Sequence, residues 1–364
     1  MKKFLFVMLF VLPFIFSFQS KTTQQQDVGD SIHYAREKHF KNIRQLTFGA
    51  DNAEAYWSFD GKKITFQSNN KDWGFNCDHI FYMPLEGGTD LSRGEKPQLI
   101  STGEGRTTCS FFMPDGKSIL YASTHLGGKE CPKDVERKPG GKYLWPVYDS
   151  YEIFVADLNG KIINQLTNSP GYDAEATISP KKDKIVFTST RNGDLDLYVM
   201  DIDGKNVKQI TYEVGYDGGA FISPDGKKIV FRASRFKTDE EKKEYLDYLK
   251  QGLVAPTAME IFTCKVDGSD LKQITHLGKA NWAPFYHPSG KKIIFSSNHK
   301  GKRGFEFNLF MINEDGSDLK QITYDKVFDS FPMFSPDGRK VIFSSNRNNG
   351  GTHNTNLFVA DWID

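Results

Sequence analysis

The sequence predicts an all-β protein, and within that class a six-bladed β-propeller with four-stranded antiparallel blades. Three short phrases carry this prediction: a turn phrase such as "SPDGKKIVF", a strand phrase such as "LYVMDIDG", and Gln-Leu-Thr or a close variant. The phrases recur in the same order through six repeats. Repeats of roughly 40 to 45 residues that each hold four short strands are typical of propeller blades.

The turn phrase predicts a tight hairpin between the first two strands of each repeat. At residues 221–235, "FISPDGKKIVFRASR" places Ser-Pro-Asp-Gly between two runs that alternate apolar and polar residues. Glycine accepts the positive φ of such a turn, and proline fixes φ at its entrance. Lys181 and Lys182 replace Asp-Gly in the third repeat. The other copies are "WSFDGKKITFQSN", "FMPDGKSILYAST", "ISPKKDKIVFTST", "YHPSGKKIIFSSN" and "FSPDGRKVIFSSN".

Four strands are expected in each repeat, here named a to d in chain order. Strand a ends at the turn, strand b is the Ile-Val-Phe run, strand c is the Leu-Tyr-Val-Met run, and strand d carries Gln-Leu-Thr. One Gln-Leu-Thr, at residues 45–47, precedes the first repeat, and none follows the last. We therefore expect the N-terminal strand to complete the last blade, which leaves no long free sheet edge. A sandwich of independent hairpins would not explain the fixed order of the phrases.

The first 20 residues, "MKKFLFVMLFVLPFIFSFQS", predict a secretory signal peptide, because two lysines precede a short apolar run. A lead-in over 21–40 and the propeller over 41–364 follow. Phe18 is a poor residue for signal cleavage, so a retained membrane anchor stays open as an alternative. We expect no other membrane span, and a monomer in the periplasm or secreted. The 47 Lys and Arg balance 46 Asp and Glu, which argues against a nucleic-acid partner.

Two insertions, at 124–150 and 236–258, lengthen the b–c connections of repeats 2 and 4. In this topology the b–c and d–a connections share one face of the disc, which we expect to be the binding face. The other face should carry only short turns. Thr238 and Glu241 predict a capping box that starts one inserted helix, whose Leu246, Leu249 and Leu253 should pack on the propeller. The end of the first insertion, which contains Trp145, could form a lid over the channel.

Alignment of the six turns predicts three rings of residues near this face. The first ring, six residues before the turn serine, should encircle the channel, because strand a is innermost. The second ring lies two residues further on and varies among repeats, so it is the better candidate for specificity. The third ring follows strand b, and its arginines could instead pair with the aspartates of the first ring, between or within blades. The first ring is Asn52, Thr107, Asp173, Asp217, Asn281 and Asp329; the second is Glu54, Cys109, Glu175, Gly219, Ala283 and Phe331; the third is Asn70, His125, Arg191, Arg235, His299 and Arg347.

From these rings, the candidate ligand-binding residues are the whole first ring, Glu54 and Glu175 of the second, and all of the third except Asn70, together with Trp145. For Trp145 the alternative is a role in anchoring its loop. The surplus acids Glu54 and Glu175 could attract a basic group or a hard cation, but we expect neither a cofactor nor a dedicated metal site.

Three cysteines, Cys77, Cys109 and Cys131, map to the insertion-bearing side of repeats 1 and 2. One disulfide among them would hold an inserted loop, but the sequence does not decide which two pair, because Cβ geometry decides it. Cys264 lies in strand c of repeat 4 and should be a buried free thiol.

The three phrases resemble the TolB-like, WD40-like (PD40) repeat family over residues 43–362. The resemblance implies a six-bladed propeller of the bacterial periplasm or cell exterior. TolB itself carries an α/β domain before its propeller. Here the first Gln-Leu-Thr stands at 45, so we expect only the propeller part to carry over.

No G-x-S-x-G, H-E-x-x-H or Walker motif is present in the sequence, so we expect no catalytic residues. The first hypothesis is a non-catalytic propeller that binds an envelope or secreted protein, a peptide or a glycan at the channel mouth. A second is a carbohydrate-active enzyme similar to the propeller oligogalacturonate lyases, with His125, His299, His353 and Arg235 as first suspects. A third is an accessory propeller for an envelope peptidase.

Overall fold

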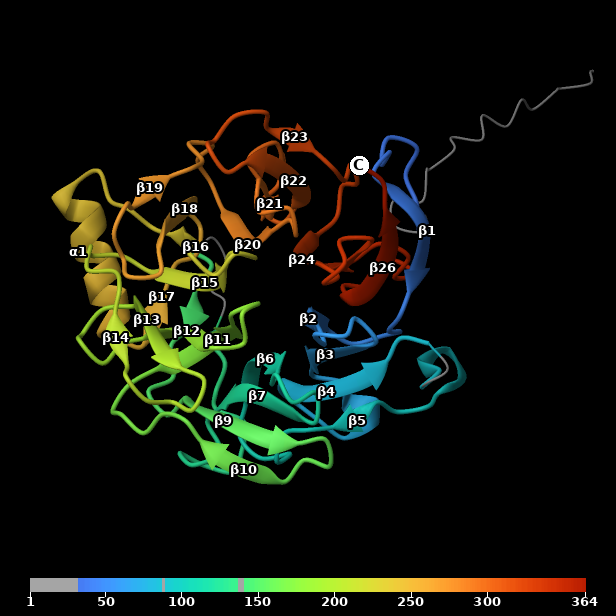
Figure 1. Ribbon diagram of the computed structural model, residues 1–364, viewed down its shortest axis with the longest axis horizontal. Coiled ribbons are helices and arrows are strands. Elements are labelled where there is room, and N and C mark those ends of the chain that lie inside the picture. Colours follow the sequence, from blue (N-terminus) through green and yellow to red (C-terminus); the bar gives the residue numbers. More distant parts are fainter. Residues whose placement is uncertain (1–31, 87–88, 137–140) are drawn as a thin grey trace, which may run out of the picture.

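The computed structural model describes residues 32–86, 89–136 and 141–364, which form six four-stranded antiparallel sheets arranged around a central axis (Figure 1). The predicted six-bladed propeller is thus confirmed. The predicted signal peptide and residues 21–31 of the lead-in lie outside the described residues. No helix in the described part of the chain is long and apolar enough to cross a membrane.

Blades 1 to 3 each contain four consecutive propeller strands, ordered a to d in the sheet. Blade 1 is β2 (Asn52–Trp57), β3 (Lys63–Ser68), β4 (His79–Pro84) and β5 (Gln98–Leu99). Blade 2 is β6 (Thr107–Phe112), β7 (Ser118–Ser123), β9 (Glu152–Asp157) and β10 (Ile162–Gln165). Blade 3 is β11 (Asp173–Ile178), β12 (Lys184–Ser189), β13 (Asp196–Asp201) and β14 (Lys208–Gln209).

Blades 4 and 5 have the same order, whereas blade 6 takes its outermost strand from the start of the chain. Blade 4 is β15 (Asp217–Ile222), β16 (Lys228–Ala233), β18 (Glu260–Lys265) and β19 (Lys272–Gln273). Blade 5 is β20 (Asn281–Tyr286), β21 (Lys292–Ser297), β22 (Asn308–Asn313) and β23 (Lys320–Gln321). Blade 6 is β24 (Asp329–Phe334), β25 (Lys340–Ser345), β26 (Asn356–Trp362) and β1 (Phe40–Gln45).

The ring closes as predicted, because β1 pairs antiparallel with β26, with Phe40 opposite Trp362. Phe40 also stacks on Phe343 of β25, with ring centroids 5.3 Å apart. The first and the last described strands are therefore held in one sheet, and β1 covers the outer edge of β26 in blade 6.

The Gln-Leu-Thr phrase recurs because it supplies hydrogen bonds that the outermost strands lack. The threonine hydroxyl accepts a backbone N–H of the neighbouring strand c; for example, Thr211 accepts from Leu197 at 2.8 Å, and Thr47 accepts from Leu357 at 2.8 Å across the closure. The glutamine side chain donates to the carbonyl of the residue two positions later, as Gln209 does to Thr211 at 2.8 Å. Buried backbone groups need such partners.

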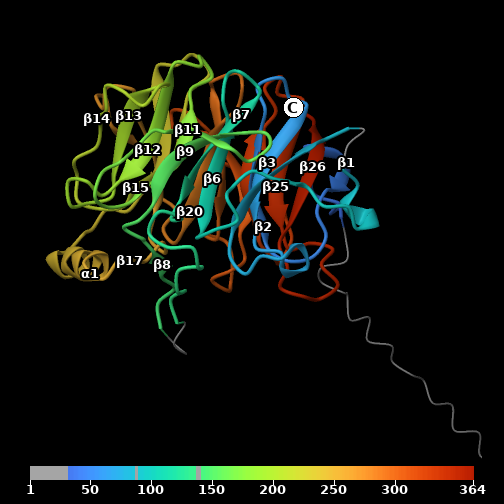
Figure 2. The ribbon, with the colours of Figure 1, turned by 90° about the horizontal axis from the view of Figure 1, so that it is seen from below.

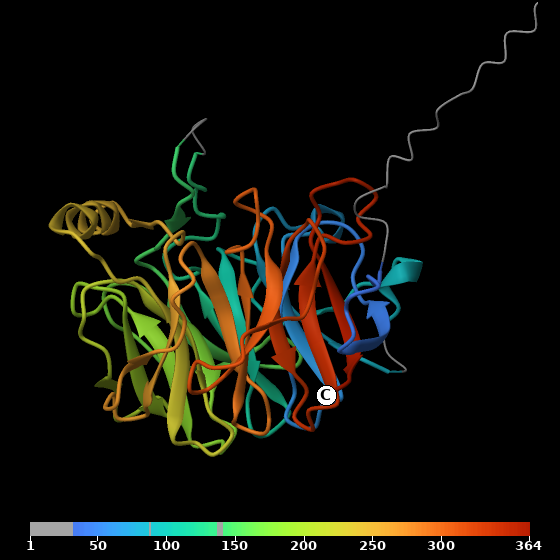
Figure 3. The ribbon, with the colours of Figure 1, turned by 90° about the horizontal axis from the view of Figure 1, so that it is seen from above.

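The two insertions are joined to each other on one face of the disc (Figures 2 and 3). They contain β8 (Trp145–Pro146), which pairs with β17 (Leu253–Val254), and the helix α1 (Asp239–Leu249). Thr238 caps α1, accepting from the Glu241 N–H at 3.2 Å, while Glu241 accepts from the backbone of Lys237.

Two details of the insertions differ from expectation. Leu253 belongs to β17 and not to the helix, whose buried residue is Tyr245. The prediction that the opposite face carries only short turns is wrong for blade 1. In blade 1 the connection from β4 to β5, on the opposite face, is longer and holds the 3-10 helix η2 (Leu91–Arg93). Another 3-10 helix, η1 (Lys71–Trp73), lies between β3 and β4, on the face that carries the insertions.

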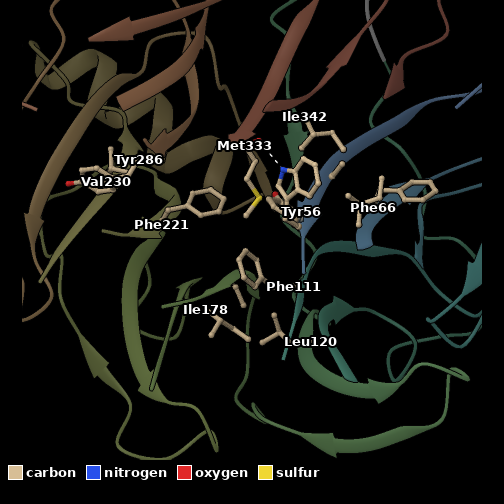
Figure 4. Packing of buried hydrophobic residues seen from close by; sticks show 14 of the residues in the cluster. Tyr56, Phe66, Phe111, Leu120, Ile178, Phe221, Val230, Tyr286, Met333 and Ile342 are labelled. Carbon is tan, nitrogen blue, oxygen red and sulfur yellow. Dashed lines mark hydrogen bonds between the residues drawn. The ribbon is translucent and has the colours of Figure 1, made fainter. Parts of the chain in front are cut away.

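The core consists of apolar side chains from the alternating strand runs, packed between adjacent blades and toward the axis (Figure 4). Five phenylalanines of strand b are fully buried, and blade 2 has Tyr121 in the equivalent place. The phenylalanines are Phe66, Phe187, Phe231, Phe295 and Phe343.

Candidate functional site

A β-bulge interrupts strand a of every blade at the same position. The register with strand b shifts around the third residue of each strand a. The residue at each bulge has φ between 42° and 58°. Residues other than glycine rarely adopt a φ in this range, and a bulge changes the direction in which its residue's side chain points. The six bulge residues are the second ring of the sequence alignment, Glu54, Cys109, Glu175, Gly219, Ala283 and Phe331.

All six bulge residues line one cavity of about 410 Å³ in the central channel, here called the chamber. Its floor is aromatic. Tyr56 of blade 1 and Phe221 of the opposite blade 4 meet across the axis with ring centroids 6.0 Å apart, and Phe111 lies 5.8 Å from Tyr56. Figure 4 shows these three rings gathered at the axis. Since opposite blades are in contact here, the chamber is closed on this side.

The roof of the chamber is the strap formed by β8, β17 and the residues that follow β8. Trp145, Val147 and Tyr148 line the chamber, and the Trp145 ring lies 5.1 Å from that of Trp282. Val147 and Tyr148 also line an outer cleft of about 780 Å³ that extends beneath α1. Trp145 thus lies over the chamber, as expected of a lid residue, and its contact with Trp282 also anchors its loop.

A disulfide anchors the first insertion, and it joins Cys77 to Cys131. Cys77 is buried in the connection after η1, so the bond fastens the insertion to blade 1. Of the two remaining cysteines, Cys109 lies in the chamber wall and Cys264 in strand β18, and both are buried free thiols.

One wall of the chamber holds a charged pair, Glu175 and Arg232. Arg232 Nη2 donates to Glu175 Oε1 at 2.7 Å and to the Tyr216 hydroxyl at 2.6 Å. Glu175 Oε2 accepts from the backbone of Gly219 at 2.7 Å. Burial acts to raise the pKa of Glu175, but the Arg232 charge and these donors outweigh it and the pKa is lowered. The pair is therefore ionised.

Glu54 has a different environment on the neighbouring wall. Its Oε2 accepts from the Tyr56 hydroxyl and from the Cys109 thiol, both at 2.9 Å, and no cation among the described residues hydrogen-bonds to it. Burial raises the pKa of Glu54, and it raises the pKa of the Cys109 thiol as well. Cys109 is accordingly a hydrogen-bond donor and not a reactive thiolate.

The wall of the chamber is polar on one side and apolar on the other. Blades 1 to 4 contribute Glu54, Glu175 and Arg232, among other polar groups, whereas blades 5 and 6 contribute Ala283 and Phe331. Two further aromatic rings, Trp282 and Phe328, line the apolar side.

Most residues of the first and third rings are bonded to other protein groups and do not line the chamber. Their charged members pair inside single blades: Arg191 Nη2 lies 2.9 Å from Asp173 Oδ2, Arg347 Nη2 lies 2.9 Å from Asp329 Oδ2, and Arg235 is paired with Asp217. The alternative of pairing within blades thus describes these residues.

The uncharged members of these rings also bond locally. Asn52 donates to the Gly49 carbonyl and Asn281 to that of Met259, while His125 and His299 bond the hydroxyls of Ser123 and Ser297, each at 2.9 Å. Asn70 caps η1. Four of the nominated residues line the chamber, namely Glu54, Thr107, Glu175 and Trp145. The other ten nominated residues do not line the chamber; they are Asn52, Asp173, Asp217, Asn281, Asp329, His125, Arg191, Arg235, His299 and Arg347.

Arg232 is the functional candidate that the sequence reasoning missed. It is the fifth residue of strand b in blade 4, and its guanidinium reaches the chamber because the bulge residue beside it is Gly219. A signal was present in the sequence, since the fifth residue of strand b is small or neutral in the other repeats. Those residues are Gln67, Ala122, Thr188, Ser296 and Ser344.

The residues first suspected of lyase chemistry do not come together. His125, His299, His353 and Arg235 belong to different blades or loops, and none of them lines the chamber. In the described ranges there is also no group of three or more His, Cys, Asp or Glu side chains arranged to hold a metal ion.

The fold and the chamber together define a six-bladed β-propeller with a covered central cavity. Residues 139–247 match the TolB beta propeller domain (PD40), and the resemblance seen in the repeats is confirmed. No curated protein is similar enough to the chain to count as a match.

Solved structures share the fold at low sequence identity. A protein of Agrobacterium tumefaciens provisionally named TolB is 19% identical with a TM-score of 0.58, covering 88% of this chain and 97% of that one. TolB from Acinetobacter baumannii is 19% identical with a TM-score of 0.50, covering 86% of this chain and 64% of that one. An oligogalacturonate lyase from Vibrio parahaemolyticus is 12% identical with a TM-score of 0.48, covering 88% and 93%. At this similarity the first two comparisons show the fold alone, and no conclusion is drawn from the third.

Proposed function

We propose that the protein is an exported, non-catalytic TolB-like propeller that binds a protein, peptide or glycan partner in the chamber. One observation carries the proposal: the bulge residues of all six blades line a single covered cavity, and five of them carry side chains. Residues held at positive φ cost free energy, of the order of 1 kcal/mol or more each, and tend to persist at functional sites. The volume of about 410 Å³ is within the range of small-ligand sites.

The closed floor supports the end of a chain as the bound part. A partner cannot pass through the disc, because Tyr56 and Phe221 meet across the axis. A terminal residue of a peptide, or one or two sugar units, would fill the space. We propose binding rather than catalysis because Cys109 is held as a neutral thiol and the suspected lyase residues lie outside the chamber. By its resemblance to TolB propellers, we place the protein in the periplasm or secreted, and we expect a monomer.

The experiment is titration calorimetry of the purified chain against a panel of short peptides and oligosaccharides. Ala283→Phe fills the apolar side of the chamber, and the backbone should accept it because Phe331 occupies the equivalent bulge in blade 6. Phe305→Ser is the control, since Phe305 is exposed in a loop of blade 5 outside the chamber. A panel member should bind the wild type and the control and fail to bind Ala283→Phe. Binding that survives Ala283→Phe, or conversion of a panel member to product, would contradict the proposal.

A further inference from the structure

The chamber contains a cation, Arg232, whose hydrogen-bonding capacity is only partly used by the protein. Arg232 is 7% exposed and lines the chamber. Its Nη2 serves Glu175 and Tyr216, whereas Nε has no partner in the described structure, and no acceptor among the described residues takes a hydrogen bond from Nη1. A buried guanidinium with unused donors is costly, and an anionic acceptor would relieve that cost.

Gly219 gives this guanidinium its access. A Cβ built on Gly219 would lie 1.9 Å from Arg232 Nη1, so any side chain there would displace the group. The need for glycine does not come from the backbone, because the other five bulges hold non-glycine residues at similar φ, including Ala283 at 47°. The absence of a side chain at 219 therefore lets Nη1 occupy the position that a bulge residue fills in the other blades.

Other charges near the chamber make Arg232 the better anion site. Arg106 also lines the chamber, and its Nε likewise has no partner among the described residues, but its guanidinium already faces Asp134 at 2.7 Å and Asp78 at 3.8 Å. Glu54 would repel an anion if it were ionised. Burial raises the pKa of Glu54, which favours its neutral form.

We infer that the chamber binds the C-terminal end of a polypeptide, with the terminal carboxylate on Nη1 of Arg232 and the last side chain, an apolar one, against Ala283 and Phe331. This inference rests on the proposed function and names its ligand. The apolar side favours a peptide over an acidic sugar, because Ala283, Phe328 and Phe331 offer no partners for the hydroxyls of a sugar ring. The closed floor agrees with a ligand that ends at this point.

The test uses N-acetylated tetrapeptides ending in leucine or phenylalanine, each made with a free C-terminal carboxylate and as the C-terminal amide. Fluorescence anisotropy with the full chain should show the free acid binding about 10- to 100-fold more tightly than the amide, the range for a hydrogen bond to a charged group. In Gly219→Ala this preference should fall toward onefold, since the guanidinium is displaced while Arg232 is retained.

A second variant keeps the test valid if displacement of Arg232 impairs folding. Arg232→Met combined with Glu175→Gln removes both charges together, so that no unpaired buried charge remains. It should also abolish the preference for the acid. The matched control, Arg191→Gln with Asp173→Asn, neutralises an equivalent pair outside the chamber and should leave the preference unchanged.

The outcomes separate this inference from the proposed function. If acid and amide bind wild type equally and Ala283→Phe abolishes both, chamber binding stands and the carboxylate assignment is overturned. Binding of an oligosaccharide ending in uronic acid, but of neither peptide form, overturns the peptide assignment. Absence of binding by every probe overturns the inference as well.

Discussion

The first ring and the bulge ring lie two residues apart on the same six strands, and they differ in almost every respect. The first ring repeats its chemistry, with Asp or Asn in five blades and Thr107 in blade 2. Its aspartates pair with an arginine of the same blade, whereas Thr107 and Asn281 donate to backbone carbonyls of the preceding blade. The bulge ring repeats its backbone conformation but not its side chains. In this protein the polar position that recurs holds the blades together, and the position that varies forms the cavity.

The largest effect should come from the third-ring arginine that pairs with the first ring at the site of ring closure. Arg347 is fully buried and is paired with Asp329, Asp325 and Glu37, the last of which precedes β1. Arg347→Met leaves these carboxyls without their cation, which should lower the free energy of unfolding by about 3–5 kcal/mol. Urea denaturation measures it. Arg339→Met, which alters an exposed arginine, is the control; a loss below about 1 kcal/mol for Arg347→Met would show that the pair is not needed for closure.

The next largest effect concerns the disulfide of the first insertion, the segment that also contributes β8 to the strap over the chamber. Cys131→Ser removes a disulfide that closes a separation of 54 residues. A loss of about 4 kcal/mol is expected if the stabilisation is mainly restriction of the unfolded chain, within a usual range of 2–5. Urea denaturation of the variant should match that of wild type in reductant. If reduction leaves the wild-type unfolding curve unchanged, the disulfide does not stabilise the fold.

A smaller effect is expected at Asp78, next to the point where Thr107 of the first ring reaches the chamber. Thr107 donates to the backbone carbonyl of Asp78, whose carboxyl has its pKa raised to about 6 by burial, against the opposing effect of Arg106. The folded state thus holds this proton between about pH 4 and 6 while the unfolded state has lost it. Relative to Asp78→Asn, wild-type stability should fall as pH rises through that window, by no more than about 3 kcal/mol. Urea denaturation at several pH values tests it, and equal pH dependence in the two proteins would contradict it.

The smallest effect belongs to the bulge ring itself. Glu54→Gln is isosteric, keeps an acceptor for Tyr56 and Cys109, and removes a carboxyl whose pKa is raised by burial. At pH 8 the unfolding free energy should rise slightly or stay the same, within about 1 kcal/mol. A decrease of more than about 2 kcal/mol in the free energy of unfolding, measured by thermal or urea denaturation, would contradict this and would mean that Glu54 stabilises the fold as Arg347 is expected to do.

The sequence was sufficient for the fold because its repeated phrases have local causes. Gln209 and Thr211 supply hydrogen bonds to their own blade, and Gly226 supplies the positive φ of the turn, at 77°. The closure by β1 followed from the one Gln-Leu-Thr at residues 45–47. Each of these signals acts within one repeat or one strand pair, so each is readable in the chain.

The chamber was only partly predictable, because its geometry depends on contacts between blades. The varied ring was singled out, but nothing about Cys109 or Phe331 signals a residue at positive φ, where glycine would be expected. Arg232 reaches the axis only because Gly219 beside it has no side chain. The pairing of Cys77 with Cys131, and not Cys109, likewise depends on positions that the insertion sets.

The contact between Tyr56 and Phe221 has a kinetic consequence. With the far side shut, a guest must leave by the opening through which it came, beneath the strap that holds Trp145. A substitution that makes the strap open more easily, at a residue that does not contact the bound ligand, lowers the free-energy barrier for both binding and release. Association and dissociation would then accelerate together, while the equilibrium constant stays nearly constant.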